Sequence, residues 1–310
     1  MPAFQDDTLK SNNGYTDLRV RVCRPDGAPR GVVQIAHGIA EHVERYDDFA
    51  AFLADHGFLV VANDHLGHGK SIRDPSEEGF FADQGGWQLV VEDMRKLCSQ
   101  VHEANWNLPY FLFGHSMGSF LTRTYLIRFG EGLTGAILSG TGQTPRAAVT
   151  AARRMAQLEI QRHGMRFKSA GLNGLIFRGY NKGIDHPRTP HDWLSRDGAV
   201  ADRYKADPLC GFIPTVGLIS DMMTGIAYNQ DTDNLSRMRK DLPVYFMSGD
   251  RDPVGDYGAG VFRAYQSFLN AGLNDVTLKL YAGGRHEMLN ELNREQVYRD
   301  ILNWLELRMG

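Results

Sequence analysis

Short, continuous apolar runs alternate along most of this chain with segments in which apolar residues recur every three or four positions. A continuous apolar run is typical of a strand buried on both faces, and the second pattern is typical of an amphipathic helix. Such alternation predicts an α/β protein with a mostly parallel central sheet and helices on both faces. The strands predicted in this way cover residues 31–36, 58–62, 110–113, 135–139, 244–247 and 276–280.

Two segments depart from this alternation. In residues 15–23 apolar and polar side chains alternate, which predicts an antiparallel, edge-type strand with one face in water. Between about Gln143 and Met238 no buried strand is predicted, and Arg, Gly and Met are frequent. Because binding elements are commonly insertions on a rigid scaffold, we interpret this segment as a mainly helical cap or lid over one end of the sheet. A rigid extension of the core is the alternative.

The chain is therefore divided into three parts. Residues 1–142 form the first part of the core, residues 143–238 form the predicted cap, and residues 239–310 form the second part of the core.

A Gly-x-Ser-x-Gly motif, from Gly114 to Gly118, joins the strand at 110–113 to an amphipathic helix. In this motif a serine stands on a strained turn with its hydroxyl exposed. Glycine is needed on both sides because the strand and helix backbones come so close that a Cβ would collide. Ser116 is therefore the predicted nucleophile.

A serine nucleophile needs an adjacent base, and the base needs an acidic group to orient it. His286 lies on a glycine-rich loop after the last predicted strand, and Asp250 and Asp252 follow the strand before it. Both aspartates qualify by position, and a turn at Gly249 favours Asp252, because it leaves room for the chain to bend back toward His286. We predict that His286 acts as general base and then acid, while Asp252 holds its tautomer.

The negative oxygen of a tetrahedral intermediate needs backbone N–H donors, each worth roughly 3–4 kcal/mol. Met117 N–H, directly after the nucleophile at a helix N-terminus, is one predicted donor. The other is Ile39 N–H, because Gly38 allows a tight bend after the strand at 31–36.

Composition narrows the classes of function. With 310 residues and a net charge of −3, the chain has no basic surplus that would indicate nucleic acid or an anionic membrane as partner. Its three cysteines are widely spaced, which excludes a disulfide framework or a cysteine zinc cluster and suits a reducing compartment. The sequence has no signal-like beginning and no window near the ~18 apolar residues of a membrane span. We expect a cytoplasmic protein without a metal ion or an organic cofactor.

With these motifs in place, the chain resembles the α/β-hydrolase fold and, more narrowly, the monoglyceride lipase and lysophospholipase-like branch. The resemblance implies that Asp252 is the acid, and that Glu41 and Arg45 line the polar end of the pocket, where such enzymes hold a glycerol-like head group. His115, beside the nucleophile, is assigned to substrate binding with them. The matching residues are His37-Gly38-Ile39-Ala40-Glu41-His42-Val43-Glu44-Arg45-Tyr46, Asp64-His65-x-Gly67-His68-Gly69-x-Ser71, Gly114-His115-Ser116-Met117-Gly118, the Gly249-x-x-Asp252 loop and His286.

These observations predict a serine hydrolase that cleaves carboxylic esters with one acyl chain, such as monoacylglycerols or lysophospholipids, through an acyl-enzyme at Ser116. Thioesterase, lactonase and aminopeptidase activities on the same triad are alternatives. A non-catalytic binding module that kept the fold is the alternative from another class. The expected partner is a small acyl ester, with transient contact to a lipid interface; the sequence does not predict the oligomeric state.

Overall fold

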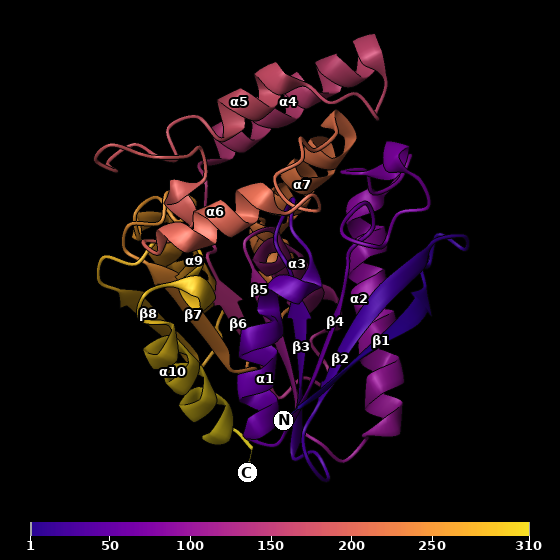
Figure 1. Cartoon of the computed structure of the whole chain (residues 1–310), viewed down its shortest axis with the longest axis vertical. Helices are drawn as coiled ribbons and strands as arrows, with labels where there is room; N and C mark the ends of the chain where they lie inside the picture. The colour runs from indigo at the N-terminus through magenta and orange to yellow at the C-terminus, as the bar shows by residue number, and fades with distance from the viewer. Residues whose placement is uncertain (1, 310) are drawn as a thin grey trace.

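A computed structural model of the protein describes residues 2–309 and contains one eight-stranded sheet (Figure 1). The strands lie in the order β1-β2-β4-β3-β5-β6-β7-β8, and β2 alone runs antiparallel to its neighbours. The predicted mostly parallel sheet is confirmed. Its strands are β1 (Ala3–Lys10), β2 (Asp17–Arg24), β3 (Gly31–Ala36), β4 (Phe58–Asn63), β5 (Tyr110–His115), β6 (Gly135–Ser139), β7 (Val244–Gly249) and β8 (Val276–Tyr281).

Helices cover both faces of the sheet, because its central strands bury side chains on both sides. In β5, Tyr110 and Leu112 pack into the core under α2, α3 and α9, whereas Phe111 and Phe113 pack into the core under α1 and α10. These helices are α1 (Asp47–Asp55), α2 (Gly86–Ala104), α3 (Met117–Phe129), α9 (Ala259–Asn270) and α10 (Arg294–Glu306), and short 3₁₀ turns are η1 (Val43–Tyr46), η2 (Pro75–Glu77) and η4 (Met288–Asn290).

The strand predicted at 15–23 exists as β2, but the prediction that it is an edge-type strand with one wet face is wrong. β1 pairs with it on one side and β4 on the other, so β1 forms the edge of the sheet. Five of the eight residues of β2 are buried, whereas only Leu9 of β1 is buried.

Between β6 and β7 the described chain is helical (Figure 1). Of these helices, α7 packs against α3 and shares the core on that face of the sheet, while α4 and α5 lie farther out. The boundaries at 143 and 238 stay a prediction. The elements are α4 (Arg146–His163), α5 (Ala170–Ile176), η3 (Asp192–Leu194), α6 (Gly198–Ala206), α7 (Val216–Asn229) and α8 (Thr232–Leu235).

A buried arginine on α3 contacts the chain before α4 and the last residue of α7. The Arg123 guanidinium donates to the carbonyl of Gly142 at 2.9 Å and to that of Asn229 at 3.4 Å. Burial lowers the pKa of Arg123 to about 10, which still leaves the group charged at neutral pH.

No described helix is both long enough and apolar enough to cross a membrane.

Candidate active site

Ser116 lies in the turn between β5 and α3, in a backbone conformation that is rare for a non-glycine residue. Its φ of 52° and ψ of −121° place it outside the regions that L-residues readily adopt. A Cβ on Gly118 would overlap the Ala36 carbonyl of β3, and one on Gly114 would overlap the Gly118 carbonyl. The close approach expected at both glycines is therefore present.

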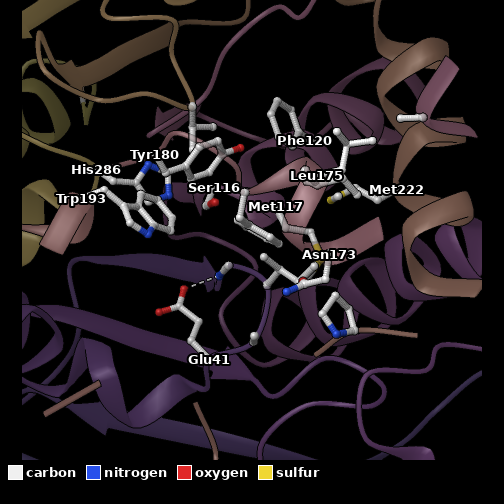
Figure 2. Close-up of a pocket in the computed structure, with 18 of the residues that line it drawn as sticks. Glu41, Ser116, Met117, Phe120, Asn173, Leu175, Tyr180, Trp193, Met222 and His286 are labelled. Carbon is white, nitrogen blue, oxygen red and sulfur yellow. Dashed lines mark hydrogen bonds between the residues drawn. The ribbon is translucent and has the colours of Figure 1, made fainter. Parts of the chain in front are cut away.

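The loops that follow β7 and β8 bring Asp252 and His286 together. His286 Nδ1 donates to Asp252 Oδ2 at 2.9 Å, and the two residues are 2% and 0% exposed. The backbones of the loops also meet, because a Cβ on Gly249 would overlap Gly284. With Nδ1 occupied, Nε2 is the imidazole nitrogen left for Ser116, which lies at the same end of the cavity (Figure 2).

Asp250 points elsewhere. Its Oδ1 accepts the Gly283 N–H at 2.8 Å, whereas both oxygens of Asp252 accept hydrogen bonds near the imidazole. Ser248 donates to Asp252 Oδ2 at 3.0 Å, which is a contact that sequence reasoning missed.

The carboxylate and the imidazole stabilise each other's charged form. Burial would raise the pKa of Asp252, but the imidazole and the hydrogen bonds from His286, Val254 and Ser248 hold it below its usual value. Burial would likewise lower the pKa of His286, but the charge of Asp252 and its hydrogen bond hold it above the usual value. This arrangement suits a base that becomes cationic during the reaction.

We expect kcat/KM to fall as the pH decreases through the pKa of His286, because a protonated imidazole cannot accept the Ser116 proton. Since Asp252 raises that pKa above the usual 6.5, the midpoint of the acid limb should lie above pH 6.5. A pH profile of kcat/KM on an uncharged short ester measures it, and a midpoint below 6.5 contradicts the assigned pair.

The two predicted oxyanion donors belong to segments that meet at Ser116, because Met117 follows it in the chain and a Cβ on Gly38, next to Ile39, would lie 3.1 Å from Ser116 Cβ. Ile39 and Met117 line the same cavity, and within residues 2–309 neither backbone N–H has a protein acceptor. The neighbouring Gly38 N–H instead donates to the Glu41 carboxylate (Figure 2). The Glu41 side chain therefore fixes the turn that presents Ile39.

Ala40 completes this turn with a φ of 54°, in the left-handed region that favours glycine. Two groups from the helical segment hold it there. The Tyr204 hydroxyl and the Gly211 N–H each donate to the Ala40 carbonyl, both at 2.9 Å.

The three residues assigned to substrate binding are placed differently. Glu41 and His115 line the cavity, whereas Arg45 does not. Arg45 lies between the carboxylates of Glu41 and Glu287, with its Nε 2.9 Å from Glu41 Oε2. Burial, together with the neighbouring His286, lowers the pKa of His115 to about 3, so this ring is neutral. The binding roles of Glu41, Arg45 and His115 therefore all stay predictions.

The Glu41→Gln variant is expected to lose roughly tenfold in kcat. The amide accepts the Gly38 N–H less strongly than a carboxylate does, so the turn is less well fixed. The loss should be smaller than the 10²–10³ that follows removal of an oxyanion donor itself. Glu44→Gln is the matched control, because Glu44 pairs with Arg19 and Lys70 outside the cavity. Equal effects of the two substitutions would contradict a positioning role.

Aromatic side chains from the helical segment complete the site. The Trp193 ring lies 4.9 Å from the His286 ring, measured between centroids, and the His115 ring lies 4.6 Å from it (Figure 2). Trp193 and Tyr180 line the cavity, and the Trp193 carbonyl accepts the His286 N–H at 3.4 Å. Sequence reasoning missed both, because a turn such as that at Tyr180 and a 3₁₀ element of three residues such as η3 are too short to give a periodic pattern.

The cavity measures about 630 Å³ and is mainly apolar. Its polar groups gather around Ser116 and Glu41, and its apolar walls extend under α4, α5 and α7 (Figure 2). The apolar wall includes Phe120, Val149, Ala152, Leu172, Leu175, Met222, Met223 and Ile226. Within residues 2–309, the only cluster of three metal-ligating side chains is His42, Asp207 and Cys210, none of which lines this cavity.

Comparison with known proteins places the chain in a family. The family described as serine aminopeptidase, S33, matches residues 27–293. The chain is 30% identical over 293 residues to a monoacylglycerol lipase of Mycolicibacterium smegmatis, across 92% of this chain and 91% of that protein. It is 28% identical over 312 residues to the monoglyceride lipase of Homo sapiens, across 98% and 92%. The crystal structure of a highly thermostable carboxyl esterase from Bacillus coagulans in complex with glycerol has a TM-score of 0.92 and 31% identity, over 99% of each chain.

These matches span the Gly114–Gly118 turn (the elbow), the loop that carries Asp252 and the loop that carries His286. They confirm the predicted α/β-hydrolase fold and the resemblance to monoglyceride lipases. The chain is a serine ester hydrolase that belongs to the serine aminopeptidase S33 family, within the monoglyceride lipase-like branch of the α/β hydrolases.

Proposed function

We propose that this protein hydrolyses monoacylglycerols, with Ser116 as nucleophile, His286 as general base and acid, and Asp252 as the group that orients and stabilises the imidazole. The observation that carries the proposal is the buried His286–Asp252 pair at 2.9 Å beside a strained serine, at the polar end of an apolar cavity.

The reaction proceeds through an acyl-enzyme. His286 Nε2 takes the Ser116 proton as the oxygen attacks the ester carbonyl, and the Ile39 and Met117 N–H groups stabilise the resulting oxyanion. The imidazolium returns the proton to the departing glycerol oxygen. Water, activated by the same imidazole, then attacks the acyl-enzyme and releases the fatty acid.

The charges around the cavity favour an uncharged head group over a phosphate. Among the described residues that line it there is no Lys or Arg, while Glu41 and Glu287 contribute carboxylates. The Arg45 guanidinium is already paired with both carboxylates. A lysophospholipid would place its phosphate near two anions without a free cation, whereas glycerol hydroxyls can donate to them. The esterase from Bacillus coagulans, which is similar throughout, was crystallised with glycerol.

A substrate panel tests the proposal. Monoacylglycerols, lysophosphatidylcholines of the same acyl chains, p-nitrophenyl esters and amino-acid p-nitroanilides are compared by kcat/KM. We expect the monoacylglycerols to exceed the lysophospholipids at every chain length and the anilides to remain uncleaved. Preferred cleavage of anilides would support the aminopeptidase alternative, and a preference for lysophospholipids would overturn the head-group argument.

The Ala152→Phe variant is expected to lose activity on long acyl chains while retaining it on a butyrate ester. Ala152 lies on the α4 wall of the cavity, so a phenyl ring there occupies the space of the distal acyl carbons. Each methylene excluded from the cavity removes about 0.8 kcal/mol of binding, so KM should rise steeply with chain length. Ala147→Phe is the control, because Ala147 is an exposed alanine of the same helix that does not line the cavity. Parallel losses on long and short esters would instead mean damage to the fold.

The free cysteines and the exposed apolar side chains indicate where the enzyme acts. Its three cysteines are free, which favours the cytoplasm. Exposed apolar side chains of α4 and α5, including Met155, Leu158 and Leu175, favour transient contact with a lipid interface from which the substrate enters.

A further inference from the structure

A cluster of potential metal ligands lies beside the turn at residues 38–41, which carries the predicted donor Ile39 and is called the oxyanion turn below. His42, Asp207 and Cys210 each offer one ligand atom, and these atoms lie within 4.8 Å of one another. His42 directly follows Glu41, while Asp207 and Cys210 belong to the loop after α6. The cluster therefore joins two segments that are far apart in sequence.

The donor set has the chemistry of a zinc site. Imidazole nitrogen, carboxylate oxygen and thiolate sulfur bind Zn²⁺ at about 2.0–2.3 Å, which places neighbouring ligand atoms of a tetrahedral site roughly 3–4 Å apart. His42 Nε2 and Asp207 Oδ2 are 2.8 Å apart, and no two of the three ligand atoms are more than 4.8 Å apart, so side-chain rotation has to close a gap of at most about 1–2 Å to reach that geometry. The second ring nitrogen of His42 is buried and has no protein partner among the described residues.

The cluster is accessible to a cation from solvent. His42 and Asp207 line a second, open cavity of about 430 Å³, separate from the active-site cavity. Carboxylates outnumber guanidinium groups along its wall, but Glu44 and Asp47 are already paired with Arg19 and Arg21, and the Arg45 guanidinium, which is paired with Glu41 and Glu287, also interacts with the Cys210 thiol. The acidic residues are Glu44, Asp47, Asp48, Asp197 and Asp207, and the basic ones are Arg45, Arg203 and Arg294.

We propose that His42, Asp207 and Cys210 bind a zinc ion, or a divalent cation of similar ligand preference, at a site separate from the reaction centre. On binding, a metal–sulfur bond replaces the S–H bond of Cys210 and the proton passes to solvent. A water molecule takes the fourth position.

Such an ion ties the helical segment to the oxyanion turn. Gly211, next to Cys210, already donates its N–H to the Ala40 carbonyl, two residues before His42. A cation held between the two segments reinforces this contact and stabilises the folded state in proportion to its occupancy.

Zinc titration of the full chain, after treatment with a chelator, tests the site by calorimetry and thermal melting. We expect one Zn²⁺ per chain and a rise in Tm. Cys210→Ser should weaken binding by at least about tenfold, the lower end of the loss that follows removal of even a supporting group from a metal site. Cys98→Ser is the matched control, because Cys98 is a half-buried free cysteine on α2, and it should bind as the unaltered chain does.

Cobalt provides a readout that does not depend on any variant or on activity. Co²⁺ bound to the unaltered chain should show a sulfur-to-cobalt charge-transfer band and the intense visible absorption of a tetrahedral site. A titration without heat or change in Tm, a cobalt spectrum without the sulfur band, or equal zinc affinity in Cys210→Ser would each overturn the proposal. None of these results bears on ester hydrolysis at Ser116.

Discussion

The Ser116→Ala variant is expected to lose roughly a millionfold in kcat, as serine hydrolases do when the nucleophile of a triad is removed. Alanine has no oxygen to attack the ester, so no acyl-enzyme forms. The backbone bond from the residue 116 N–H to the Ser139 carbonyl, at 2.9 Å, does not involve the hydroxyl, so the elbow should persist. Hydrolysis of p-nitrophenyl butyrate gives the rate, and mass spectrometry after fluorophosphonate treatment locates the labelled residue.

Ser267→Ala is the control for this prediction. The Ser267 hydroxyl donates only to the Ala264 carbonyl of its own helix, α9, and the residue does not line the cavity. This variant should keep full activity and full labelling. Substantial turnover or labelling in Ser116→Ala would exclude Ser116 as the nucleophile, whatever else the structure contains.

The Asp252→Asn variant is expected to lose about 10⁴-fold in kcat. An amide cannot stabilise the imidazolium, and it favours the tautomer whose Nε2 carries a proton and cannot act as base. Without the carboxylate, burial is the largest influence left on the pKa of His286 and lowers it, while the charges of Glu287 and Glu41 oppose this only in part. The acid limb of the remaining activity should therefore move to lower pH. A pH profile separates this effect from simple misfolding, which would not move the limb.

Asp250→Asn distinguishes the two candidate acids. The Asp250 carboxylate accepts the Gly283 N–H and makes no hydrogen bond to His286, so its replacement should change kcat by no more than a few-fold. If Asp250→Asn were the severe variant and Asp252→Asn the mild one, the acid would be misassigned.

The sheet and the elbow could be predicted from the sequence because their signals are local. A strand such as β5, buried on both faces, must be apolar at every position, and an elbow between crowded backbones must carry glycine. Ser116, Asp252 and His286 follow the parallel strands β5, β7 and β8. Because these strands run in the same direction, all three residues could be placed at the carboxyl end of the sheet.

The first strand could not be predicted because little of it is buried. Only Leu9 of β1 is buried, so apolar residues do not recur at every second position on either face of the strand. β1 is held instead by its backbone pairing with β2 and by ion pairs from Arg19 and Arg21 of β2 to Asp6. These contacts depend on a partner strand, and no pattern within residues 3–10 reveals it.

The contacts made by the helical segment were hidden for a similar reason. Trp193 reaches His286 from the short η3 turn 93 positions away in the chain, and Tyr204 reaches Ala40 from 164 positions away. The Glu41 carboxylate accepts the N–H of Gly38, which is only three residues away in the chain. Sequence reasoning still missed this contact, because the family resemblance indicated a role for Glu41 in substrate binding and not in fixing the backbone.

The unusual backbone at Ala40 makes the turn before Glu41 depend on distant parts of the chain. An alanine in the left-handed region costs roughly 1–2 kcal/mol, and here Tyr204 and Gly211 supply the restraint. Because the two donors come from residues 164 and 171 positions farther along the chain, a substitution that removes the Tyr204 hydroxyl should relax this backbone and shift the Ile39 N–H, although Tyr204 makes no hydrogen bond to the triad.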